Sequence, residues 1–288
     1  MAAIRPIDIH MHPSTDLFMD CGGDYLKAID EFFKVNHPVK EIDGVVKDMD
    51  GAGVALGVIF GWDAESATGL PPVPNDHIAA LVAEYPDRLI GFASVDPWKG
   101  KAALAELERA VDDLGLKGLK LHPPIQDFFP NDPMVYPLYE KCIDLDIPIL
   151  FHCGFTGLGM GKAGGMGIKL KYARPIYLDD VAADFPEVTI IAAHNGWPWE
   201  NELLASCLHK ANLYIDLSGW LPKYIPKAVI SYMNTLLADK MVFGSDYPYI
   251  DPKRWLKGFE ELELKEGVRE KVLEGNARRI LKLAERSA

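Results

Sequence analysis

The stretch IDIHMHP, residues 7–13, opens the chain as a short apolar strand that ends in two histidines. Side chains two residues apart on a strand point to the same face, so we expect Ile7 and Ile9 to share one face. His10 and His12 then share the other. Two neighbouring imidazoles either pack in a core or form part of a metal site. Residues elsewhere in the chain distinguish between these two possibilities.

Seven further apolar runs, bounded by Gly, Pro or polar residues, have the length of strands. Helical periodicity separates them, for example in residues 101–115. This alternation predicts βαβ units and a parallel sheet. Eight such units fit a single-domain α/β fold, the (β/α)8 TIM barrel, over residues 1–288; a doubly wound sheet is the alternative. Residues 274–288 are expected to form a helix with Asn276 as its N-cap. The expected strands are residues 7–12, 54–60, 89–96, 115–122, 147–153, 188–194, 212–218 and 240–246.

Composition excludes several classes of function. The chain has 288 residues, 49% of them hydrophobic, and a formal net charge of −12. An acidic protein is a poor partner for nucleic acid. No apolar run approaches the roughly 20 residues that span a bilayer, and no cleavable signal precedes the first strand, which predicts a cytoplasmic protein without a membrane anchor. The four cysteines lack CxxC spacing and are expected as reduced thiols: Cys21, Cys142, Cys153 and Cys207.

Polar residues close several of the expected strands. Lys120 and His122 end the fourth strand, His152 the fifth, His194 the sixth and Asp246 the eighth. In a (β/α)8 barrel the active site lies at the carboxyl ends of the strands, so these side chains and the two histidines of the first strand are expected to meet. The remaining histidines, expected at the surface in helices or loops, are His37, His77 and His209.

The residue types at these ends suit a divalent metal. Three imidazoles and one carboxylate, from His10, His12, His152 and Asp246, favour Zn²⁺, with Mn²⁺ or Fe²⁺ as alternatives. A bound metal lowers the pKa of its water toward ~7. His194 is the expected general acid or base, because imidazole titrates near neutrality. Asp246 is expected to act in catalysis too, by accepting a proton from the same water.

Other residues near the strand ends are candidates for substrate contact. Trp197 and Trp220 follow the sixth and seventh strands, which favours a pocket wall over a core position. His122 shares a face with Lys120. Lys120 has an alternative role, as an ion-pair partner of Asp216.

The connection after the fifth strand, residues 154–175, is glycine-dense and then basic. Loops of this length in a compact domain are usually functional, and we expect a lid. Its cations, Lys162, Lys169, Lys171 and Arg174, have no acidic residue among them. They predict a local positive field for an anionic substrate, for example a coenzyme A thioester, with a solvated loop as the alternative.

The same loop contains G-x-G-x-x-G at residues 159–164, with Asp179 20 residues beyond Gly159. This pattern binds dinucleotides when it forms a tight turn directly after a strand. Here the glycines begin several residues after the strand, so we do not expect a dinucleotide.

Five motifs, in order along the chain, carry a resemblance to a known family. They are D-x-H-x-H (8–12), FHCG (151–154), AHNG (193–196), GSDYP (244–248) and GNARRIL (275–281). The chain resembles the metal-dependent amidohydrolase superfamily, in the branch of aminocarboxymuconate semialdehyde decarboxylase, resorcylate decarboxylases and pyrone dicarboxylate lactonase. The resemblance implies the same four metal ligands and His194 as general acid or base.

Two properties differ within this family. In binuclear relatives such as dihydroorotase a carboxylated lysine bridges two metals, and KLHP with Lys120 looks similar. Most members of the decarboxylase-like branch hold one metal. We therefore expect one ion, with Lys120 either holding a substrate carboxylate or serving as a cation behind the metal ligands.

The family also catalyses both hydrolysis and non-oxidative decarboxylation. We expect hydrolysis of a carboxylate-bearing ester, lactone or acyl thioester, because the chain lacks the long insertions of the larger decarboxylases. Decarboxylation of an aromatic or muconate-like acid is the alternative. The expected partner is a small anionic molecule, and a homo-oligomer is one possible assembly. Residues expected to contact substrate are Lys120, His122, Trp197, Trp220, Tyr247 and Arg174.

Overall fold

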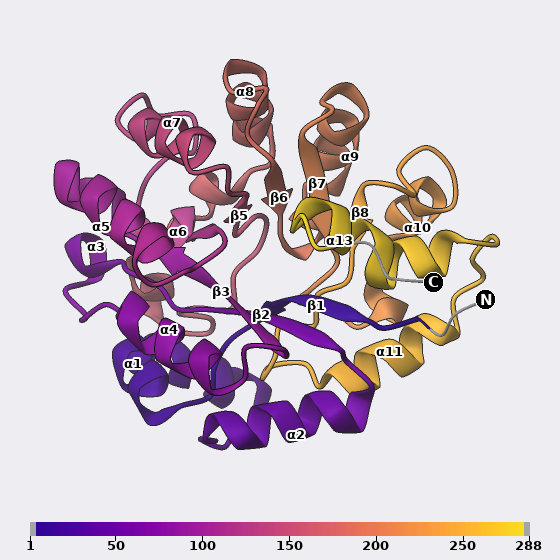
Figure 1. Cartoon of the computed structure of the whole chain (residues 1–288), viewed down its shortest axis with the longest axis horizontal. Helices are drawn as coiled ribbons and strands as arrows, with labels where there is room; N and C mark the ends of the chain where they lie inside the picture. The colour runs from indigo at the N-terminus through magenta and orange to yellow at the C-terminus, as the bar shows by residue number, and fades with distance from the viewer. Residues whose placement is uncertain (1–3, 285–288) are drawn as a thin grey trace.

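The computed structural model describes residues 4–284 (Figure 1). Eight parallel strands follow one another around a barrel in chain order, with helices outside the ring, so the predicted (β/α)8 barrel is confirmed. Each strand pairs in parallel with the next. The strands are β1 (Ile7–Met11), β2 (Leu56–Phe60), β3 (Leu89–Ser94), β4 (Leu119–Leu121), β5 (Ile149–Phe151), β6 (Ile190–Ala192), β7 (Leu213–Asp216) and β8 (Met241–Val242).

Hydrogen bonds between β1 and the segment directly after β8 close the ring. Ile9 N donates to Phe243 O at 3.1 Å, and Asp246 N donates to His10 O at 2.9 Å. Beyond them, His12 N donates to a carbonyl in the segment that follows β8. The same contacts place the two motifs that are expected to bind metal, DIHMH and GSDYP, side by side although they lie more than 230 residues apart.

The helices pack through apolar stripes at helical spacing. Helix α5 buries Ala103, Leu107 and Ala110 against the barrel and leaves its charged residues outward. Thr15 is the N-cap of helix α1, and its hydroxyl accepts a hydrogen bond from Phe18 N. The α-helices are α1 (Asp16–Phe33), α2 (Ile42–Ala52), α3 (Glu65–Thr68), α4 (Asn75–Glu84), α5 (Lys101–Asp112), α6 (Pro123–Gln126), α7 (Tyr136–Asp144), α8 (Ile176–Asp184), α9 (Glu200–His209), α10 (Lys227–Met233), α11 (Pro252–Glu260), α12 (Val268–Glu270) and α13 (Asn276–Ile280).

Two apolar clusters fill the molecule, one between barrel and helices and one within the barrel. The inner cluster contains Ile7, Ile9 and Phe60, and α13 contributes to it. The register of β1 shifts between Asp8 and Met11, so strict alternation fails there. As a result Ile9 lies in the same cluster as Phe60. The centre of the Phe60 ring is 4.9 Å from the ring centres of both His10 and His12, so Ile9 and these histidines are not separated on opposite faces as expected.

Apart from β2, the expected strands extended too far at their carboxyl ends, and several of them also began too early. The terminal helix also differs from the prediction. Asn276 has helical φ and ψ and follows the π-turn η6 (Lys271–Gly275), so it does not cap a helix. Its side-chain amide donates instead to Ala238 O and Met241 O, and so ties this segment to the barrel. Residues 285–288 of the predicted helix lie outside the described residues.

All four cysteines are buried free thiols, as expected. Among residues 4–284 no helix combines the length and the apolar character that crossing a membrane requires.

Candidate active site

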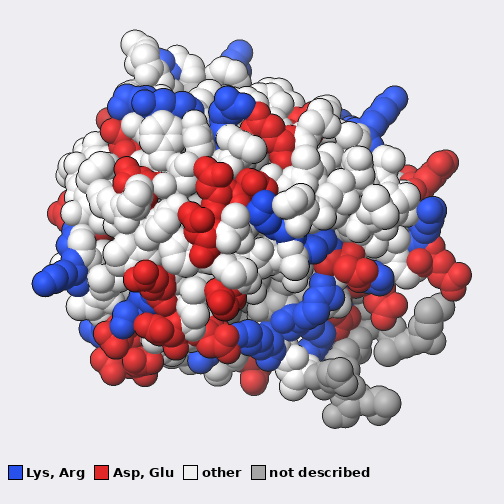
Figure 2. Space-filling view, turned by 90° about the horizontal axis from the view of Figure 1, so that it is seen from above, with Lys and Arg blue, Asp and Glu red and all other residues white. Residues whose placement is uncertain are grey.

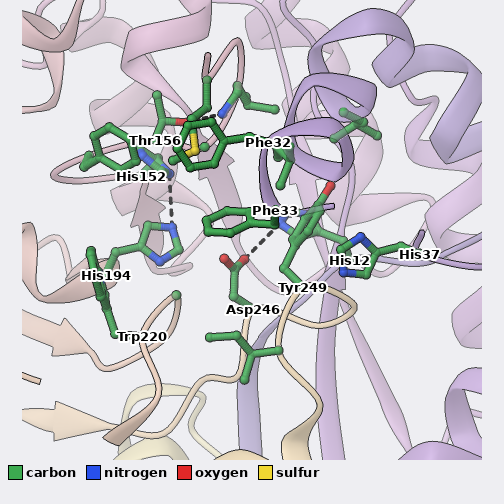
Figure 3. A pocket seen from close by; sticks show the side chains of 18 of the residues that line it. His12, Phe32, Phe33, His37, His152, Thr156, His194, Trp220, Asp246 and Tyr249 are labelled. Atoms are coloured by element: carbon green, nitrogen blue, oxygen red, sulfur yellow. Dashed lines mark hydrogen bonds and ion pairs between the residues drawn. The ribbon is translucent and has the colours of Figure 1, made fainter. Parts of the chain in front are cut away.

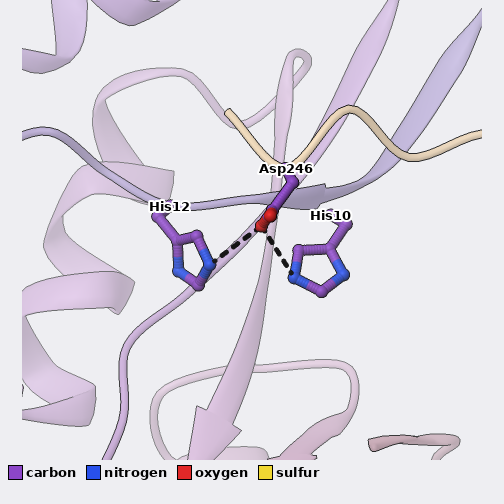
Figure 4. Close-up of side chains that lie close together, drawn as sticks. All are labelled: His10, His12 and Asp246. Atoms are coloured by element: carbon purple, nitrogen blue, oxygen red, sulfur yellow. Dashed lines mark ion pairs between the residues drawn. The ribbon is translucent and has the colours of Figure 1, made fainter. Parts of the chain in front are cut away.

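Three side chains form a metal-type donor group at the carboxyl end of the barrel (Figure 4). His10 Nε2 and His12 Nε2 each lie 3.4 Å from Asp246 Oδ1. One donor atom from each residue falls within 4.8 Å of the others. The two motifs that the barrel closure brings together therefore supply this group.

His10 is oriented by a carboxylate behind it. Its Nδ1 lies 2.6 Å from Asp216 Oδ2, and both side chains are fully buried. A carboxylate accepts, so the proton is on Nδ1 and the Nε2 lone pair faces the donor group. Ser218 Oγ donates to the same oxygen at 2.7 Å.

The hydrogen bonds continue through two further histidines. Ser218 donates its single hydroxyl proton to Asp216, so Ser218 Oγ accepts a hydrogen bond from His194 Nδ1 at 3.1 Å. His194 Nε2 is then an acceptor for His152 Nδ1, also at 3.1 Å. This sequence of donors leaves His152 with an unprotonated Nε2.

His152 is not part of the three-residue donor group but lies beside it. In Figure 3 His152 and His194 line one side of the pocket, His12 and Tyr249 the other, and Asp246 lies between them. The ring of His194 is 4.8 Å from that of His10 and 4.6 Å from that of His152.

The buried nitrogens fit a metal ion. His10 Nε2 and His152 Nε2 are both buried without a hydrogen-bond partner in the part of the chain that the structure describes. Unpaired buried polar atoms are rare because each costs free energy. Two bare imidazole lone pairs next to a carboxylate are a donor set for a divalent cation.

The electrostatics keep these rings neutral. Burial, together with nearby positive groups, lowers the pKa of His10 and of His152 well below the usual histidine value. Burial also lowers the pKa of His194 to about 4. Burial alone would raise the pKa of Asp246, but His194, His12 and Lys120 outweigh it and hold it below its usual value. Neutral imidazole and ionised carboxylate are the forms that bind metal.

Two of these residues have unusual backbone conformations. His194 has φ 61° and Asp246 has φ 71°, in the left-handed region that non-glycine residues seldom adopt. Packing around them is tight. A Cβ on Gly219 would lie 2.4 Å from His194 Nδ1, and one on Gly244 would lie 2.3 Å from Asp216 Oδ1. The site therefore depends on two glycines.

A cavity of about 700 Å³ opens above the donor group. Its polar lining comes mainly from the site histidines and Asp246, and the rest is largely aromatic and aliphatic. Three of the residues expected to contact substrate line it, namely His122, Trp197 and Trp220. His122 stacks on His152 with ring centroids 3.8 Å apart.

The other three do not line this cavity. Tyr247 is buried, and its hydroxyl donates to Asp48 of α2 at 2.7 Å. Arg174 pairs with Glu202 and lies over Trp199. These two contacts hold both side chains outside the pocket.

Lys120 lies in the barrel, 3% exposed, with Nζ 4.8 Å from the centre of the Phe60 ring. Its Nζ has no hydrogen-bond partner among the described residues, and burial lowers its pKa to about 8. The alternative role of Lys120, an ion pair with Asp216, is not formed as a direct contact, although the two charges interact. Lys120 therefore adds positive potential beneath the donor group.

The basic loop does not present its charges to the pocket. Lys162 pairs with Glu31, and Lys169 pairs with Asp127 at 2.9 Å. Lys171 lies over the Phe129 ring at 5.2 Å. Basic and acidic side chains are interspersed on the face shown in Figure 2. The loop lines the cavity instead with Phe155, Thr156, Gly157, Leu158 and Met160.

Several cavity residues were not anticipated from the sequence, His37, Tyr249 and Arg254 among them. His37, expected at the surface, lines the pocket and pairs with Asp30 of α1. Tyr249 lies between His37 and His12, with ring distances of 5.0 and 6.2 Å. Arg254 of α11 is the third. Of these three residues, only Tyr249 has a sequence signal that could have identified it, because it lies three residues after Asp246.

The family model for amidohydrolases matches residues 7–283. The chain belongs to this amidohydrolase family. The expected resemblance is therefore confirmed for the whole barrel.

Curated relatives are distant and mostly carry decarboxylase names. A 2-amino-3-carboxymuconate-6-semialdehyde decarboxylase from Dictyostelium discoideum is 24% identical over 257 residues, which cover 78% of this chain and 70% of the relative. A 2-keto-4-carboxy-3-hexenedioate hydratase from Sphingobium is 27% identical over 240 residues, covering 72% and 69%. Gamma-resorcylate decarboxylases are similarly related.

Solved structures match the whole barrel. An uncharacterised TIM-barrel protein from Bordetella bronchiseptica superposes with a TM-score of 0.83 at 28% identity, covering 97% of this chain and 99% of the other. A dihydroxybenzoic acid decarboxylase from Polaromonas, solved with manganese and 2-nitroresorcinol, gives 0.72 at 20% identity, covering 98% of both chains.

Proposed function

We propose that this protein is a metal-dependent, non-oxidative decarboxylase of a small aromatic or muconate-like acid. The observation that carries the proposal is the donor group of His10, His12 and Asp246 at the base of a largely apolar cavity. The decarboxylase names of several relatives support it.

Hydrolysis, expected from the sequence, has weaker support. The expectation of hydrolysis depended on the absence of long insertions, and none of the curated relatives named above carries a hydrolase name. An apolar cavity also favours a reaction that converts a carboxylate into neutral CO2, because unpaired charge is costly in such surroundings. We therefore place decarboxylation first.

We assign the metal to His10, His12 and Asp246, with His152 Nε2 as the fourth donor. When bound, a divalent ion supplies Lewis-acid chemistry at substrate oxygens. Mn²⁺ is the ion of a structural neighbour, and it suits this set of nitrogen and oxygen donors as Zn²⁺ does.

His194 is the residue we assign to proton transfer. Loss of CO2 breaks a carbon–carbon bond, and the carbon left behind requires one proton. His194 lines the cavity beside the donor group, and imidazole is the side chain that most often transfers protons in enzymes. Asp216 and Ser218 fix the orientation of the ring from behind.

The test is turnover of a panel of carboxylic acids by protein loaded with Mn²⁺ or Zn²⁺. We expect labelled CO2 from a ¹³C-carboxylate, with one deuteron on the product carbon in D2O. Water addition to an unsaturated acid, without CO2, would replace this proposal with hydration. Ester or lactone cleavage alone would restore hydrolysis.

A further inference from the structure

The cavity is larger than the acids in the names of the relatives require. Ligand pockets of about 300–1,000 Å³ bury drug-sized molecules, and this one has about 700 Å³. A single-ring acid seated at the donor group would fill only its base. The remaining volume extends away from the donor group and has room for a further part of the ligand.

Apolar side chains from opposite sides form that outer volume. Helix α1 and the segment after it contribute Phe32, Phe33 and Val35, and these are 52%, 57% and 46% exposed. Trp220 and Tyr224 also line the cavity. Large exposed aromatic side chains at a cavity mark a surface that binds an apolar group.

One cation in this lining has no acidic partner. Within residues 4–284 the loop cations are directed to other groups, as described above, whereas no ion pair is formed by Arg254. Arg254 lies in the first turn of α11, is exposed and lines the cavity. Among the described residues that line the cavity, Arg254 is the only cationic side chain other than the histidines.

We propose that the pocket binds a two-ended acid, and that Arg254 selects it. One carboxylate lies at the donor group, an apolar body fills the space between α1 and Trp220, and a second anionic group pairs with Arg254. The guanidinium fork matches a carboxylate or phosphate with two parallel hydrogen bonds. The anion-binding role expected for Arg174 thus belongs to Arg254. This inference builds on the proposed function for the position of the first carboxylate.

The test compares two ligands that share one apolar body, biphenyl-4-carboxylate and biphenyl-4,4′-dicarboxylate. Binding to the Mn²⁺-loaded protein is followed by quenching of tryptophan fluorescence, since Trp62, Trp197 and Trp220 line the cavity. We expect the dicarboxylate to bind about tenfold more tightly, as a charged hydrogen-bonded pair provides. Arg254→Ala should remove this preference, and Arg254→Lys should keep part of it.

Lys253→Ala is the matched control, because Lys253 is exposed on the same helix turn but does not line the cavity. It should keep the preference, and raised salt should weaken it in the wild type. Equal affinities for the two acids, or a preference that survives Arg254→Ala, would overturn the proposal. So would binding of 2,6-dihydroxybenzoate but of neither biphenyl acid.

These readouts involve no turnover, so they separate the two proposals. A preference that depends on Arg254 in a protein that releases no CO2 would uphold the anion site and reject the decarboxylase assignment. CO2 release without the preference would do the reverse.

Discussion

Ser218 Oγ donates a hydrogen bond to Asp216 Oδ2 at 2.7 Å, and through this contact it fixes the protons on the histidines of the site. The hydroxyl has only one proton, so it can face His194 Nδ1 only as an acceptor. His194 Nε2 and His152 Nε2 are left without protons as a result. One serine behind the cavity thus sets the tautomers of His194 and His152.

Ser218→Ala should therefore lower kcat by about 10–100-fold, the usual cost of removing a partner behind an active-site ligand. Without the hydroxyl, His194 Nδ1–H has no acceptor and the ring can adopt the other tautomer. The direct measurement is the tautomer of His194 by ¹⁵N NMR of the metal-free protein. An unchanged tautomer with unchanged kcat would contradict this role.

Loss of His152 should weaken metal binding. We expect His152→Ala to raise the Kd for Mn²⁺ at least tenfold, and His12→Ala or Asp246→Asn to abolish binding in a metal titration. His122→Ala is the control, since it removes the ring stacked on His152 without removing a donor atom. Full affinity in His152→Ala would restrict the site to the three-residue group.

Metal should also stabilise the fold. A ligand that binds only the native state raises stability by RT ln(1 + [L]/Kd), about 2.7 kcal/mol at 100 times Kd. We expect Mn²⁺ or Zn²⁺ to raise the Tm of the wild type by several degrees and to leave Asp246→Asn unchanged. A metal-dependent rise of equal size in both proteins would place the ion elsewhere.

The sequence predicted those site residues that lie at strand ends, because barrel topology alone brings the ends together. His10, His12 and Asp246 were found in this way. Tyr247 was expected to contact substrate, but its hydroxyl donates to Asp48 and its side chain does not line the cavity. The carboxyl ends of the strands were overestimated because the chain leaves the sheet where residues such as His194 and Asp246 begin, at φ values that no sequence pattern reports.

The prediction of a positive field at the basic loop failed for a different reason. Lys162, Lys169 and Arg174 pair with acids 131, 42 and 28 residues away, and only the folded chain shows those partners. His37 was missed for the same reason, since its place in the pocket depends on how the segment after α1 packs beside Tyr249.

Gly219→Ala separates positioning of His194 from general stability. The new Cβ would lie 2.4 Å from His194 Nδ1, and Gly219 has φ 76°, so the variant should lose both activity and about 1–3 kcal/mol of stability. Gly267→Ala is the matched control: φ is 78°, but nothing lies within 4 Å of the added Cβ. It should incur the backbone strain alone, with a lower Tm and normal kcat. We expect kcat in Gly219→Ala to fall at least tenfold and its Tm to fall further than that of Gly267→Ala, because the added Cβ also displaces the buried His194 ring. Equal kcat values in the two variants would show that the position of the His194 ring does not limit the reaction.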